Sequence, residues 1–133
     1  GKADLGIFRP STSAWWIQRS SNSSILAAQF GATGDKPAPA DFTGDGKTDF
    51  AFFRPSSGTW YVLRSEDFSF YGFPFGISSD IPVVGDYDGD GKADAAVFRP
   101  SDNGWYLLRS TAGFIGFQFG TNGDKPISSA YLP

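Results

Sequence analysis

The chain has 133 residues, of which 40% are hydrophobic, and a formal net charge of −3. The length corresponds to about one domain, and the acidic balance excludes the basic face that nucleic acids and anionic lipid surfaces require. Cysteine and histidine are absent, which excludes disulfides, thiolate catalysis and zinc–thiolate sites, and no apolar run is long enough for membrane insertion.

A period of 45 residues organises the chain. The segments IFRPSTSAWWIQRS, FFRPSSGTWYVLRS and VFRPSDNGWYLLRS begin at Ile7, Phe52 and Val97. Each repeat contains short runs rich in β-branched and aromatic residues, bounded by Gly, Pro, Ser and Asp, which predicts strands rather than helices. In chain order we expect three strands beginning with residues 4–10, then two sets of four, and a final strand at 127–132. The last full set comprises residues 81–87, 94–100, 105–110 and 113–120.

This period is the length of a propeller blade. We therefore expect an all-β fold of four-stranded blades, with three blades in one domain (residues 1–133) and repeats at approximately 1–45, 46–90 and 91–133. Propellers typically have four to eight blades, so three blades of one chain should not close a ring. The expectation is a homodimer that closes a six-bladed ring, in which each C-terminal strand completes the partner's first sheet and removes an open edge. The alternative is that these residues are part of a longer chain whose upstream blades complete the ring.

An acidic loop occurs twice, as DFTGDGKTD from Asp41 and as DYDGDGKAD from Asp86. Alternate positions of such a loop can converge on a Ca²⁺ ion, which takes six to eight oxygen ligands in irregular geometry. An EF-hand is excluded because strands flank the loop and its twelfth position is Val97. In the second loop the predicted ligands are Asp86, Asp88, Asp90, the Lys92 carbonyl and Asp94.

In the first loop the corresponding ligands are Asp41, Thr43, Asp45, the Lys47 carbonyl and Asp49. Two loops predict two Ca²⁺ ions per chain. Because Thr43 supplies a neutral oxygen where Asp88 supplies a charged one, we expect the second loop to bind its ion more tightly. Of a third loop only Asp4 remains. The structural alternative is an Asp/Gly turn that merely keeps a hairpin soluble.

The repeats resemble FG-GAP repeats, also called VCBS-type repeats, through the Phe30-Gly31 and Phe75-Gly76 pairs and the acidic loops at 41–49 and 86–94. The resemblance implies an integrin-α-like β-propeller of the kind found in secreted bacterial proteins. It also supports calcium as the bound ion and a secreted or cell-surface location, where calcium is abundant.

These features favour a calcium-stabilised, non-catalytic binding or adhesion module that presents its loops to a protein or glycan partner. A carbohydrate-binding lectin and a purely structural, oligomerising repeat are the alternatives. No catalytic residue is predicted, because the one glutamate, Glu66, lies near a turn and most aspartates belong to the loops. The recurring tryptophans and arginines favour packing within the blades over ligand binding, and the ligand-binding residues stay unknown.

Overall fold

The computed structural model describes residues 4–127, which form strands and turns without any helix. Within this part of the chain there is accordingly no helix that could cross a membrane. Residue contacts divide the chain into two compact units, Gly1–Asp35 and Lys36–Pro133. The all-β class predicted from the sequence is confirmed.

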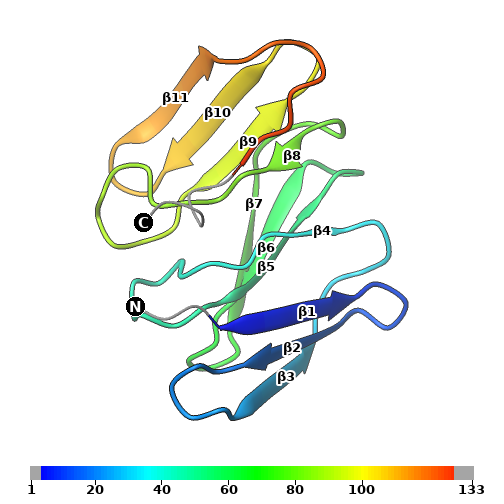
Figure 1. Ribbon diagram of the computed structural model, residues 1–133, viewed down its shortest axis with the longest axis vertical. Coiled ribbons are helices and arrows are strands. Elements are labelled where there is room, and N and C mark those ends of the chain that lie inside the picture. Colours follow the sequence, from blue (N-terminus) through cyan, green and yellow to red (C-terminus); the bar gives the residue numbers. More distant parts are fainter. Residues whose placement is uncertain (1–3, 128–133) are drawn as a thin grey trace. The chain divides into compact units, whose positions relative to one another are not determined.

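The first unit contains one antiparallel sheet in the order β1-β2-β3 (Figure 1). Its strands are β1 (Leu5–Arg9), β2 (Ala14–Gln18) and β3 (Ile25–Gln29). Since β1 has β2 as its neighbour on one side, its other side is an open edge of this sheet among the described residues.

The second unit contains two four-stranded antiparallel sheets, in the orders β4-β5-β6-β7 and β8-β9-β10-β11. The first of them comprises β4 (Lys36–Pro37), β5 (Phe50–Arg54), β6 (Thr59–Leu63) and β7 (Phe70–Pro74). The second comprises β8 (Ile81–Pro82), β9 (Ala95–Arg99), β10 (Gly104–Arg109) and β11 (Gly113–Gln118). Three sheets of this kind are consistent with propeller-like blades, and the closed ring stays a prediction.

The first strand of each four-stranded sheet is shorter than expected. Residues 81–87 were predicted as one strand, but β8 ends at Pro82. The prediction of its length was wrong because the chain leaves regular pairing there, although the Val83 N–H still donates to the Ala96 carbonyl and Gly85 forms an isolated bridge with Asp94. The strand expected at 127–132 lies outside the described residues beyond its first position.

Side chains from both four-stranded sheets share one apolar core. Phe53 and Trp60 are fully buried and belong to the same cluster as Ala95 and Val97 of the neighbouring sheet. The Phe75 ring meets Phe114 edge-on, with 6.2 Å between ring centroids. Aromatic rings thus supply much of the contact between neighbouring sheets, as expected for large apolar surfaces.

The recurring tryptophans have the same structural role in all three sheets. The indole N–H donates to the backbone carbonyl of the phenylalanine in the Phe-Gly pair or its counterpart: Trp15 to Phe30, Trp60 to Phe75 and Trp105 to Phe119, at 2.8, 3.0 and 3.0 Å. The bond ties the middle strand to the end of the outer strand. The packing role predicted from the 45-residue recurrence is confirmed for Trp15 and Trp60, which are 3% and 0% exposed.

The recurring arginines lie over aromatic rings of their own sheets. Arg9 lies over Trp16, Arg54 over Tyr61 and Arg99 over Tyr106, at 4.5, 4.9 and 4.5 Å from the ring centroids. Such cation–π contacts hold the guanidinium group in a fixed position.

Candidate metal centre

The second acidic loop joins β8 to β9 and brings three carboxylates together. One oxygen from each of Asp86, Asp88 and Asp94 lies within 4.8 Å of the others. Calcium takes oxygen ligands at about 2.3–2.6 Å, so oxygens up to about twice that distance apart can share one ion. Among residues 4–127, no other group of three or more acidic side chains has such spacing.

Backbone N–H groups hold these carboxylates in place. Asp86 accepts from Gly89, Asp90 and Gly91, and Asp94 accepts from Tyr87 and Ser110. Gly89 and Gly91 have φ angles of 76° and 87°, a region that glycine enters without steric cost. The sequence therefore folds this loop around its first aspartate.

The three side chains retain room for a cation. The Asp86 Oδ2, the Asp88 Oδ1 and both Asp94 oxygens each accept a single protein hydrogen bond. Each carboxylate oxygen has two lone pairs, so four oxygens keep one lone pair for a metal. Three anionic carboxylates with free lone pairs fit a hard divalent cation.

Asp90 is not in that group. One of its oxygens accepts the Lys92 N–H, and the other accepts the hydroxyls of Ser110 and Thr111. The two hydroxyl hydrogen bonds, Ser110 first, lower the pKa of Asp90 to about 2. The structure thus links Asp90 to the β10–β11 turn, and its predicted role as a ligand, like that of the Lys92 carbonyl, stays a prediction.

The first loop joins β4 to β5 and has the same backbone pattern. Asp41 accepts the N–H groups of Gly44, Asp45 and Gly46, while Asp45 accepts that of Lys47. The Thr43 hydroxyl lies 3.5 Å from an Asp41 oxygen.

Asp49 ends this loop as a fully buried residue. Burial raises its pKa, while hydrogen bonds from Ser65 and Phe42 act in the opposite direction. Among the described residues Asp41, Asp45 and Asp49 do not form a second close group of three. The first loop is therefore the less complete of the two sites.

A serine that the sequence analysis did not single out anchors the last aspartate of each loop. The Ser65 N–H donates to Asp49 and the Ser110 N–H to Asp94, at 2.9 and 2.7 Å. Ser20 donates to Asp4 in the same way. The signal was present in the sequence, because these serines end the recurring Arg-Ser pairs.

Glu66 is a second residue that the motif analysis left out of the site. It occupies the position of Thr111 in the next repeat, and its pKa is raised by desolvation first and then by the charges of Asp45, Asp67 and Asp49. The first loop therefore has an additional carboxylate beside Asp45 where the second loop has a hydroxyl.

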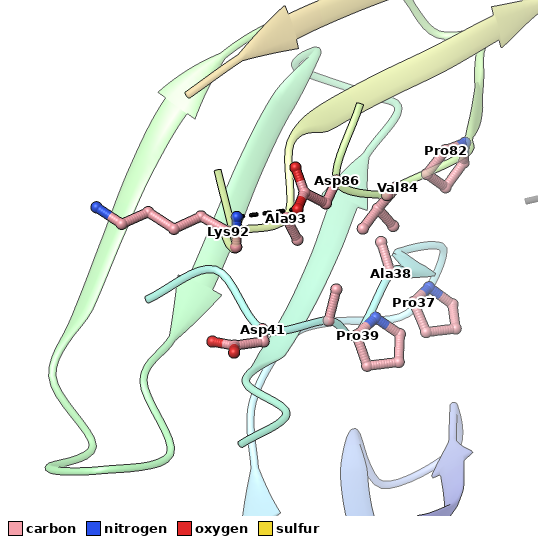
Figure 2. Close-up of a pocket in the computed structure, with 12 residues that line it drawn as sticks. Pro37, Ala38, Pro39, Asp41, Pro82, Val84, Asp86, Lys92 and Ala93 are labelled. Atoms are coloured by element: carbon pink, nitrogen blue, oxygen red, sulfur yellow. Dashed lines mark hydrogen bonds between the residues drawn. The ribbon is translucent and has the colours of Figure 1, made fainter. Parts of the chain in front are cut away.

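The two acidic loops are in contact with each other. The Ala93 N–H donates to the Asp41 carbonyl at 2.7 Å. A hollow of about 480 Å³ lies beside them, lined by Pro37, Ala38, Pro82 and Val84 together with Asp41, Asp86 and Lys92 (Figure 2). Figure 2 shows the Lys92 side chain extending away from the proline-lined part of this hollow.

The comparisons with known proteins agree with the repeat pattern. A protein-family model described as FG-GAP-like repeat matches residues 41–97, a segment that begins at Asp41 and includes the whole second loop. Searches of curated proteins and of solved structures gave no match. Residues 41–97 of this chain are therefore similar to an FG-GAP-like repeat.

Proposed function

We propose that the chain is a calcium-stabilised, non-catalytic binding module. The observation that carries the proposal is the convergence of Asp86, Asp88 and Asp94 within 4.8 Å in a loop whose backbone pattern occurs twice. Such carboxylates repel one another in the absence of a cation, and oxygen ligands select a hard ion such as Ca²⁺. When bound, the ion would fix the turn between the first and second strands of a blade.

Two ions per chain are proposed, and the second loop binds more tightly. In this loop Asp86, Asp88 and Asp94 would hold the ion. Asp90 and the Lys92 carbonyl would complete the ligand set on reorienting toward the ion. In the first loop the ligands would be Asp41, Asp45 and Asp49 with Thr43 and the Lys47 carbonyl.

The module would present its loops to a protein or glycan partner outside the cell or at its surface. Phe68, just before the outer strand β7, and Phe70, its first residue, are 49% and 67% exposed. Such apolar side chains supply contact area for a partner. The family resemblance supports the extracellular location. A lectin and a purely structural repeat remain the alternative functions, which a glycan array and a binding screen would separate.

A pair of reciprocal substitutions tests the calcium proposal. Calorimetric titration of the wild type with calcium is expected to show two sites per chain. Asp88→Thr should weaken the tighter site, and Thr43→Asp should tighten the weaker one, because each makes one loop resemble the other. Absence of binding heat, or affinities that neither substitution changes, would refute the proposal.

A further inference from the structure

The third sheet exposes an apolar face whose counterpart on the second sheet is half-buried in the shared core. Phe117 and Phe119 are 49% and 72% exposed. Their counterparts in the preceding repeat, Phe73 and Phe75, are half-buried and pack into the core shared with the next sheet. A hollow of about 340 Å³ lies on this face, beside Phe119 and the exposed Asp124.

The first sheet exposes the complementary face. Leu5 and Ile7 of β1 are 72% and 59% exposed. Their counterparts in the third sheet, Ala95 and Val97, are 4% and 0% exposed and belong to the core shared with the second sheet. The described part of the chain thus exposes both of the faces that meet in a sheet-to-sheet contact, one on the first sheet and the other on the third.

A charged pair marks the strand pairing next to this contact. Asp80 directly precedes β8, and its buried carboxylate accepts two hydrogen bonds from Arg99 at the end of the neighbouring strand β9, at 2.8 and 3.0 Å. By the repeat, the counterparts of this pair are Asp124 and Arg9. Within residues 4–127, neither of these two side chains has an oppositely charged partner.

Both halves of the second pair already have the geometry of the first. The Asp124 carboxylate accepts the Thr121 N–H at 2.9 Å, as Asp80 accepts the Ile77 N–H at 2.8 Å. Arg9 lies 4.5 Å over Trp16, the same distance that separates Arg99 from its ring. The two groups are therefore oriented to form the same bidentate pair, a favourable arrangement for arginine and carboxylate.

We propose that a second copy of this chain covers the exposed face of the third sheet with its own first sheet, joined by an intermolecular ion pair between Asp124 and Arg9. The contact is reciprocal, so two chains form it twice. Asp35, Asp80 and Asp124 each follow a turn of the same kind, and Lys125–Pro126 correspond to the strands β4 and β8. These two residues would add to the open edge of β1 in the partner, as β4 pairs with β5.

Charge reversal tests this contact without relying on the proposed calcium site. In saturating calcium, light scattering of the wild type should give twice the 14.3 kDa of one chain. D124R and R9D should each give the single-chain mass, because like charges then face each other at both contacts. Their mixture should restore the doubled mass, since each contact of a mixed pair again joins opposite charges.

The control is D67R, which reverses an exposed charge in the turn before β7 and should keep the doubled mass. Near-ultraviolet circular dichroism checks that every variant is folded. The proposal would be overturned by a single-chain mass for the wild type or by a mass that grows continuously with concentration. It would also be overturned if D124R and R9D each kept the doubled mass, or if the mixture of folded variants stayed at the single-chain mass. Calcium titration of the same samples reports separately on the calcium site.

Discussion

Asp94→Asn separates the structural role of the second loop from its role as a calcium ligand. Asp94 is 1% exposed, and its two oxygens accept the N–H groups of Tyr87 and Ser110, both at 2.7 Å. The asparagine side chain has one oxygen and one NH₂ group, so one of the two backbone N–H groups loses its acceptor. The substitution also removes one anionic ligand of the proposed site.

The expected magnitude has two parts. A buried N–H without an acceptor costs about 1–3 kcal/mol, and this loss should appear in chelator. Calcium at about a hundredfold its dissociation constant stabilises the wild type by roughly 2.7 kcal/mol, and this increment should largely vanish in Asp94→Asn. Asp49→Asn is the matched control, because Asp49 is equally buried and also accepts backbone N–H groups.

Urea denaturation with and without calcium measures both parts. Asp49→Asn should lose a similar free energy of unfolding in chelator and keep most of the calcium increment, because the tighter site is intact. An unchanged calcium increment in Asp94→Asn would refute the assignment of Asp94 as a ligand. An equal loss of the increment in both variants would refute the difference between the two loops.

Three further expectations follow from the geometry. Trp60→Phe should lower the free energy of unfolding by about 1–3 kcal/mol, because the Phe75 carbonyl loses the donor that the fully buried Trp60 supplies. Trp105→Phe, at a half-buried site, should cost less, and thermal melts that rank the two in reverse would contradict this. Gly58→Ala should be more destabilising than Gly46→Ala, although both glycines have a positive φ. A Cβ at Gly58 would lie 2.6 Å from the Gly76 carbonyl oxygen, whereas a Cβ at Gly46 would have no atom within 4 Å; equal melting temperatures of the two variants would contradict this. The hydrogen bond that the Tyr106 hydroxyl donates to the Asp102 carboxylate raises the pKa of Tyr106. The stabilisation from this bond is therefore present below the ordinary tyrosine pKa of about 10 and is lost as the pH rises through the raised value. An ultraviolet difference titration against Tyr106→Phe should show this raised midpoint, and an ordinary midpoint would disprove it.

Much of the fold follows from local signals in the sequence. The recurrence of strand-forming runs every 45 residues predicted the strands that became β9, β10 and β11, with bounds within one or two residues. The tryptophan at a fixed place in each repeat predicted a packing role, and its indole N–H supplies the same bond each time. Periodicity is informative here because each sheet repeats the same contacts.

The site was harder to predict because its details depend on distant residues. The spacing of the aspartates indicated a loop that gathers carboxylates, but the orientation of Asp90 depends on hydroxyls of Ser110 and Thr111 in a turn after β10. Glu66 replaces Thr111 beside the first loop, a difference that only the fold brings next to Asp45. Spacing within a motif does not show which side chains reach it from other strands.

The most direct measurement is the anomalous difference density of a crystal grown with calcium. We predict a peak in the second loop, with oxygens of Asp86, Asp88 and Asp94 at about 2.3–2.6 Å from it. A second, weaker peak is expected in the loop of residues 41–49. Well-ordered carboxylates of Asp86, Asp88 and Asp94 without any peak between them, at saturating calcium, would contradict it.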